Sequence, residues 1–250
     1  MIVPAYPTTH GAPSSAADTW RREHRFFTRS TLVIAVIVLI GFGFSTYIRT
    51  RPGATAFGGP TLKPLVRIHA AVSSGWIALL LFQTFLVATR RTHLHRRLGI
   101  VGGALASGVI VFGWLVAVRA TDPTVNPQAF EFFILPSSEL LVFTVLIACA
   151  LLWRQTPSTH KRLMLLGTLA LIPAATTRPV PPGSLLFLIG MVGVPEAVFI
   201  LALVGHDLRT TRRVHPATMW GGGLVLVIAA TRVWISTTGP WLAFAEAVTQ

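Results

Sequence analysis

Among the ionisable residues in the long apolar runs of the sequence, five stand out as residues that a membrane-spanning helix would bury. They are His69, Glu139, Arg178, Glu196 and Arg232. An ionised side chain at the centre of a spanning helix costs about 2.5 to 3.5 kcal/mol on insertion, so we expect all five to face the protein interior. Acids at this depth can exchange protons, act as general acid and base, or form buried ion pairs with arginines.

The two acids lie near the middle of their apolar runs. At about 1.5 Å of rise per residue, Glu139 lies about 14 Å into the run 130–153, and Glu196 about 18 Å into the run 184–205. In a catalytic site, Glu139, Glu196 and His69 would handle protons of a bound lipophilic molecule. Arg178 and Arg232 would hold its anionic groups. The alternative is two glutamate–arginine pairs, with His69 bonded to a neighbouring carbonyl.

A second group of chemically versatile residues lies at the ends of apolar runs. His95, His160 and His215 each precede such a run and are each followed seven positions later by glycine, and His206 and Asp207 end another run. Three neutral imidazoles with a carboxylate can ligate a transition metal, and two facing histidines can bind haem. The alternative is that these histidines are polar helix caps and that the glycines allow close helix packing.

Composition indicates that this chain lies in lipid. Of its 250 residues 52% are hydrophobic and only 12% are charged, and the mean hydropathy is +0.66. The net charge of +13 comes mainly from cations in short links between apolar runs, which argues against a nucleic-acid partner. The single cysteine, Cys149, excludes disulfides and thiolate clusters as organising features.

The apolar runs are long enough to predict an all-α membrane bundle of seven transmembrane helices. A span needs about 20 apolar residues, and the runs cover approximately 31–48, 64–89, 97–118, 130–153, 161–180, 184–205 and 216–236. The repeated histidine pattern predicts a first helix followed by three helical hairpins. Pro173 and Pro179 could shorten or kink the fifth helix.

Three segments follow from this division. Residues 1–30 are rich in Pro, Ser, Thr and Ala and end in a basic patch, so we expect a mobile basic N-terminus on the cytoplasmic side. Residues 31–236 form the transmembrane domain, whose first helix is not cleaved as a signal peptide. Residues 237–250 form a short external C-terminal tail.

The distribution of lysine and arginine predicts the orientation. One side of the predicted bundle collects fourteen of them, which lie in the N-terminal patch and in three short links. The excess predicts a cytoplasmic N-terminus and an external C-terminus in a bacterial inner membrane. Membrane lipid is then the first partner to expect.

Short blocks in the sequence resemble an uncharacterised family of small bacterial polytopic membrane proteins. The blocks are His95-Arg96-Arg97-Leu98-Gly99, His160-Lys161-Arg162-Leu163-Met164, and the stretch from Asp207 to His215-Pro216, within residues 64–223. The resemblance implies that His69, His95, His160, Asp207 and His215 are the positions to test. These proteins are in turn faintly similar to multi-histidine bundles of the cytochrome b561 type, a likeness that implies haem.

The leading functional prediction is a histidine-ligated metal or haem redox protein that acts in the membrane plane, with a lipophilic small molecule or a quinone as partner. In this interpretation His95, His160 and His215 hold the metal with His206 or Asp207, while Glu139 and Glu196 move protons. One alternative is a cofactor-free intramembrane cyclase or isomerase that uses the two glutamates as acid and base. The other is a proton-coupled small-solute transporter.

Overall fold

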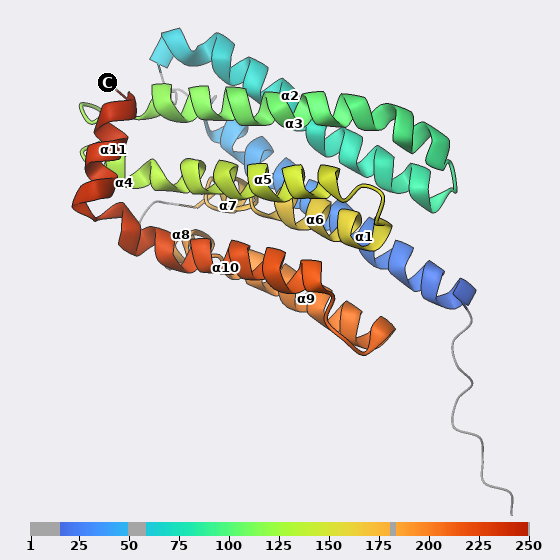
Figure 1. Cartoon of the computed structure of the whole chain (residues 1–250). Helices are drawn as coiled ribbons and strands as arrows, with labels where there is room; N and C mark the ends of the chain where they lie inside the picture. The colour runs from blue at the N-terminus through green and yellow to red at the C-terminus, as the bar shows by residue number, and fades with distance from the viewer. Residues whose placement is uncertain (1–15, 50–58, 181–183, 250) are drawn as a thin grey trace, which may run out of the picture.

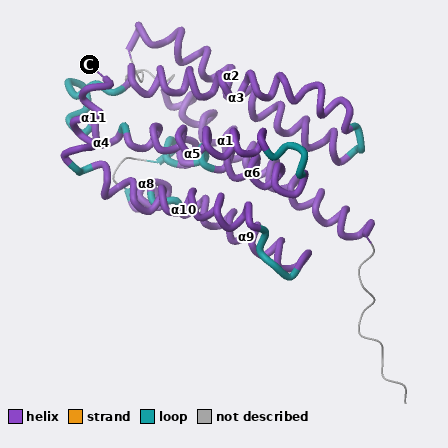
Figure 2. The backbone as a smooth tube through the Cα atoms, in the orientation of Figure 1, coloured by secondary structure: helices purple, strands orange, loops and turns teal. Residues whose placement is uncertain are grey.

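The computed structural model describes residues 16–49, 59–180 and 184–249. Within these ranges the chain forms helices joined by turns and loops, without a strand (Figures 1 and 2). The predicted all-α class is confirmed. The helices are α1 (Ala16–Arg49), α2 (Gly59–Ala88), α3 (Thr92–Ala120), α4 (Ala129–Phe132), α5 (Ile134–Leu152), α6 (Pro157–Leu169), α7 (Pro173–Thr176), α8 (Leu185–Met191), α9 (Val194–Thr211), α10 (Pro216–Ser236) and α11 (Gly239–Thr249).

Short basic links join helices at one end of the bundle. They connect α2 to α3, α5 to α6 and α9 to α10, and the start of α1 lies at the same end (Figure 1). We call this the basic end, and we call the opposite end, across which α11 lies, the α11 end. Two of the links reverse direction through arginines in the left-handed region, Arg90 with φ of 61° and Arg212 with φ of 56°.

The described helices support a multi-pass membrane protein, but they do not confirm a count of seven spans. Five are long and apolar enough to cross a membrane, and a bent pair of helices, α8 with α9, raises the number to six. Large apolar side chains such as Leu39, Ile100 and Leu201 are exposed on the outside of the bundle. Lipid is the solvent that accommodates such a surface.

The predicted fifth span, 161–180, does not form one helix. Helix α6 ends at Leu169, and the four-residue α7 begins at Pro173 after a break. Proline has no amide hydrogen and clashes with the preceding helical turn, so a helix continues poorly through this position. The 13 residues of α6 cover about 20 Å, which is short of a full crossing.

The predicted sixth span, 184–205, is also interrupted. Helices α8 and α9 meet at an angle of 52° across a short break. At this break Gly193 has a φ of 83°, a conformation that a side chain would strain, and Pro195 occupies the first turn of α9. In a bilayer, the backbone groups at such a break must be satisfied by other groups of the protein.

Both predicted terminal segments contain helix. Residues 16–30, expected to be mobile, belong to α1, while residues 1–15 lie outside the described residues. The expected tail contains α11, which packs against α4, α3 and α10. The indole of Trp241 donates a hydrogen bond of 2.9 Å to the Phe130 carbonyl, and Ala245 is fully buried.

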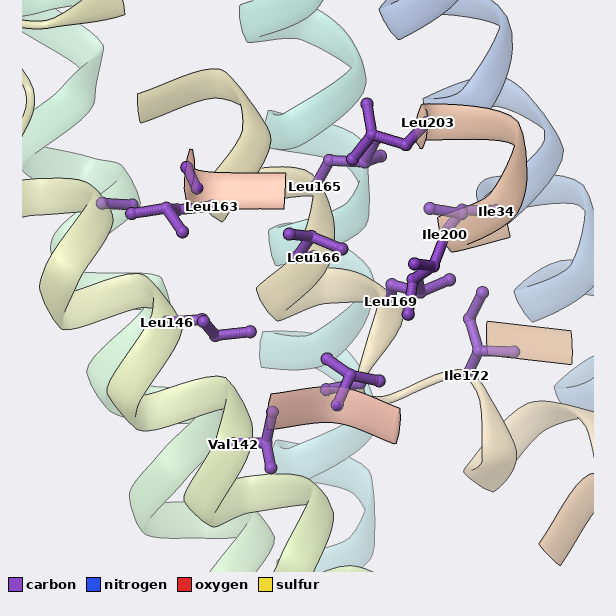
Figure 3. Packing of buried hydrophobic residues seen from close by; sticks show 14 of the residues in the cluster. Ile34, Val142, Leu146, Leu163, Leu165, Leu166, Leu169, Ile172, Ile200 and Leu203 are labelled. Atoms are coloured by element: carbon purple, nitrogen blue, oxygen red, sulfur yellow. The ribbon is translucent and has the colours of Figure 1, made fainter. Parts of the chain in front are cut away.

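A leucine-rich core joins the helices. Leu163 and Leu166 of α6 pack with Leu146 of α5, and the same cluster includes Ile34 of α1 and Leu203 of α9 (Figure 3). All five are at most 1% exposed. This core places the polar residues of α5, α9 and α10 beside one another.

Helix α1 fits against α7 through a glycine. A Cβ added to Gly41 would lie 2.8 Å from the carbonyl carbon of Ala175, whereas one added to Gly43 would meet no atom within 4 Å. Helix α1 is therefore part of the bundle, packed too closely at this position for any side chain.

We expect Gly41→Ala to lower the free energy of unfolding by about 1 to 3 kcal/mol, because the added methyl group overpacks a contact with backbone. This corresponds to a fall of about 2 to 12 °C in the melting temperature, measured by tryptophan fluorescence in detergent. Gly43→Ala is the matched control and should melt no lower than the wild type. Equal melting temperatures for the two variants would contradict this packing.

Candidate functional site

Three of the five predicted intramembrane residues come together toward the α11 end. We call Glu139, Glu196 and Arg232 the acid–arginine cluster; their exposed fractions are 4%, 1% and 3%. Glu139 lies in the second turn of α5, Glu196 in the first turn of α9, and Arg232 about one turn before the end of α10. Three helices distant in sequence thus converge on one buried polar site.

The acid–arginine cluster surrounds a small cavity. Its polar lining is Ser138, Glu139, Glu196 and Arg232, and its volume is about 10 Å³. Apolar residues of α5, α10 and the α6–α7 break complete the wall. A cavity of this volume holds about one water molecule.

The hydrogen bonds of the cluster are incomplete. Arg232 Nε donates to the Met191 carbonyl at 2.6 Å, but Arg232 Nη2 lies 3.6 Å from Glu196 Oε1, beyond normal hydrogen-bond range. Glu139 Oε1, Glu196 Oε2 and Arg232 Nη2 are buried and have no hydrogen-bond partner. A buried polar group left in this state costs about 1 to 3 kcal/mol, so the cluster favours a proton, a water molecule or a small polar ligand.

The break between α8 and α9 creates this geometry. It leaves the Met191 carbonyl available to Arg232, and it places Glu196 at the start of α9. The free amide groups at a helix start favour a negative charge. The Gly193 turn therefore brings an arginine and an acid to the same point.

Arg178 and His69 extend the polar region beyond the cluster. The charge of Arg178 acts on both Glu139 and His69, and its guanidinium lies 4.5 Å from the centre of the Phe42 ring. His69 is half-buried, and its Nδ1 has no hydrogen-bond partner. All five predicted residues thus belong to one region, with three of them around the cavity.

A second and larger cavity lies between α3 and α5. Its volume is about 200 Å³, and Ile110, Trp114, Ser137, Leu140, Leu141 and Thr144 line it. Leu141 is 58% exposed, so this cavity opens toward the lipid-facing side. None of these lining residues is ionisable, which separates it chemically from the acid–arginine cluster.

Asp207, a predicted metal ligand, already has a full set of protein partners. Arg162 Nε donates to Asp207 Oδ1 at 3.1 Å, while the Thr218 hydroxyl and the His215 backbone amide donate to Oδ2 at 2.6 and 3.0 Å. Asp207 is 0% exposed and Arg162 is 1% exposed. The carboxylate joins α6, α9 and the start of α10, which is a structural role.

The histidines near Asp207 are also engaged in packing or capping. His215 is the N-cap of α10, where its Nδ1 accepts the Ala217 amide at 3.1 Å. The His206 ring stacks on Phe26 with 4.2 Å between ring centres. The interpretation of His215 as a helix cap agrees with this geometry.

His95 and His160 lie next to each other at the basic end. Their ring centres are 6.2 Å apart, and the Nδ1–H of His160 donates to the Ala150 carbonyl at 2.8 Å. Gln83 donates to the backbone carbonyl of His95 at 3.2 Å. These two imidazoles are the nearest approach to the predicted histidine centre.

The five predicted metal ligands do not converge. Across residues 16–49, 59–180 and 184–249, no group of three or more His, Cys, Asp or Glu side chains could hold a metal ion. Asp207 and His215 have hydrogen-bond partners in the protein, and the His206 ring packs on Phe26. Metal or haem ligation stays a prediction for the His95–His160 pair.

Sequence reasoning did not identify three participants. Ser138 lines the cavity, the Met191 carbonyl anchors Arg232, and Arg162 pairs with Asp207. Gly190, Gly193 and Pro195, close together within an apolar run, were a signal for the break that frees the carbonyl. Arg162 gave no signal of its own, because it is one of many cations in the basic links.

Comparison of the chain with protein-family models, with curated proteins and with solved structures finds no match.

We expect Asp207→Asn to lower the free energy of unfolding by about 3 to 5 kcal/mol, because it leaves Arg162 as a buried charge without its counter-ion. Asp122→Asn changes an aspartate that is exposed, and it is the matched control. Thermal unfolding of both variants in the same detergent gives the comparison. A melting temperature for Asp207→Asn equal to that of the control would refute the structural role.

The His215 cap should make stability depend on pH. Burial and then the Arg162 charge lower the pKa of the His215 imidazole from its ordinary value of 6.5. The unfolded chain thus binds this proton first, so stability is lost as pH falls below 6.5 toward the folded pKa. His215→Asn keeps a good capping residue that does not titrate.

Melting temperatures at a series of pH values check this prediction. The wild type and His215→Asn should differ little at pH about 8, and the variant should gain on the wild type as the pH falls to about 5. Parallel pH curves for the two proteins would show that His215 stays uncharged or contributes nothing to stability.

Proposed function

We propose that this chain is a membrane transport protein in which Glu139 and Glu196 bind and release protons in step with the movement of a small solute. One observation carries the proposal: two buried carboxyl groups share a water-sized cavity with a single arginine, beside a broken helix. Buried intramembrane acids that face a cavity are typical of proton relays in transporters.

The electrostatics of the cluster favour proton exchange. Two ionised carboxylates beside one arginine leave one negative charge with weaker compensation, and a buried charge of this kind is costly. Binding a proton removes that cost. Since Glu139 Oε1 and Glu196 Oε2 both lack hydrogen-bond partners, either carboxyl group has an oxygen at which the proton can bind.

The interrupted helices favour transport over a rigid redox centre. Discontinuous spans with binding groups at their breaks recur in secondary transporters, where one element moves against another. The α6–α7 and α8–α9 breaks have this form, and Arg232 contacts the second through the Met191 carbonyl. Movement at the α8–α9 break would therefore move Arg232, the positive charge that compensates the two acids.

The alternatives fit the geometry less well. A cyclase or isomerase needs a pocket of about 300 Å³ or more for its substrate, whereas the acids line one of about 10 Å³. The larger cavity has no acid or base in its lining. Two of the ligands in the redox interpretation, Asp207 and His215, instead brace and cap helices.

The positive-inside rule gives the orientation in this proposal. The arginine-rich basic end faces the cytoplasm of a bacterial cell, and the α11 end, with the C-terminus, faces outward across the inner membrane. The acid–arginine cluster then lies in the outer half of the bilayer.

We expect proton movement in proteoliposomes that contain a pH-sensitive dye. Gradients of sodium, methylammonium, glycine, chloride and nitrate are imposed in turn, and at least one should change the luminal pH. Glu196→Gln should slow that change at least about tenfold, because the amide cannot carry the proton. Glu246→Gln removes an exposed glutamate on α11 and serves as the matched control.

Infrared titration of the same proteins supplies a readout that does not depend on the solute. The infrared carbonyl band of protonated carboxylic acids should lose one component in Glu139→Gln and a different component in Glu196→Gln. The band should be unchanged in Glu246→Gln. Unchanged bands in both cluster variants, together with no luminal pH response to any gradient, would overturn the proposal.

A further inference from the structure

We infer that the transported solute is a small inorganic or carboxylate-like monoanion, and that Arg232 is its counter-charge when Glu196 is protonated. This inference rests on the proposed function and assigns the class of solute at the same site. The Arg232 side chain is 3% exposed, and an arginine stays ionised in proteins.

Arg232 depends on Glu196 for compensation. Glu196 Oε1, at 3.6 Å, is the acidic atom that forms an ion pair with it, and no other ion pair to Arg232 occurs within the described ranges. When Glu196 takes a proton from solution, its carboxylate becomes neutral and Arg232 keeps its charge. Removing one partner of a buried pair leaves a costly uncompensated cation, so an anion is drawn into the site.

The other charged groups around the cluster also favour an anion. Glu139 on α5 lines the same cavity, and the charge of Arg178 acts on both Glu139 and His69 of α2. With both acids ionised, Arg232 compensates them unequally, since it pairs with Glu196 and only shares the cavity with Glu139. With both acids protonated, the charge of Arg232 has lost its counter-ion, which favours an anion and repels a cation.

Geometry supplies a place for the anion. Arg232 Nη2 is buried without a hydrogen-bond partner, and Arg232 lines the cavity beside the start of α9, an 18-residue helix. Free amide groups at a helix start bind anions. The cavity of about 10 Å³ holds about one water molecule, so an anion such as chloride or nitrate enters only when movement at the helix breaks enlarges it.

A cation is the less suitable solute. It would have to compete with Arg232 for the same carboxylates, and Arg232 is held next to them by the Met191 carbonyl. The cluster therefore couples proton and anion: the proton neutralises Glu196, the anion then pairs with Arg232, and both leave when Glu196 ionises again on the other side.

Chloride and nitrate are the probes that test this inference, because they do not become protonated in the working pH range and cannot carry protons through lipid. An inward gradient of either anion should acidify the lumen of wild-type vesicles. Arg232→Gln should reduce anion flux at least about tenfold, and Arg119→Gln, which changes an exposed arginine of α3, should leave it intact. Arg232→Lys should keep part of the flux if folding is preserved.

Glu196→Gln provides the sharper signature, because glutamine mimics the neutral acid. This variant should still carry chloride, measured with an ion-selective electrode, but the luminal pH should no longer change. Loss of both signals in a variant with wild-type melting would overturn the anion assignment.

The two proposals fail in different ways. If sodium or methylammonium instead drives proton movement that Glu196→Gln abolishes, the transport proposal stands and the anion assignment is wrong. If no solute moves protons and the infrared bands of both acids are silent, the transport proposal itself fails.

Discussion

The contact between Arg232 and the Met191 carbonyl is the interaction on which the buried site depends. It joins the end of α10 to the break between α8 and α9, and it holds a permanent positive charge beside Glu196. Lipid offers no hydrogen bonds, so an unwound turn at this depth persists only where protein groups satisfy it. The α8–α9 break, Arg232 and Glu196 therefore depend on one another for their hydrogen bonds and charge compensation.

The two ends of the bundle use an arginine and an acid in opposite ways. At the basic end, both Asp207 oxygens have donors, and the Arg162–Asp207 pair joins three segments. At the other site, both acids and Arg232 keep atoms without partners. A buried ion pair whose hydrogen bonds are all made holds its helices rigidly together, whereas a cluster with unmade hydrogen bonds can accept a proton or an ion.

Apolar run length and the cost of buried charge were enough to predict the helical class and the residues of the acid–arginine cluster. Glu139, Glu196 and Arg232 had to face inward because lipid is a poor solvent for ions. The helix count was less predictable, since Pro173 and Gly193 interrupt segments whose hydropathy alone reads as continuous.

The roles of the histidines were not predictable from their spacing. His160 and His215 occupy equivalent positions in the sequence repeat, yet His160 lies inside α6 and donates to the Ala150 carbonyl, whereas His215 is the N-cap of α10. Which partner each ring finds depends on tertiary neighbours, and the sequence repeat contains no information on these. Asp207, likewise, is fixed by Arg162, which lies on another helix.

The close fit of Gly41 against Ala175 has a consequence for biogenesis. Because synthesis runs from the N-terminus, α1 is made before α7, and Ala175 lies 134 positions beyond Gly41. Until Ala175 has been synthesised, the Gly41 position of α1 must be covered by lipid or by the insertion machinery. Helix α1 therefore enters the membrane before α7 and reaches this neighbour only when α7 packs against it.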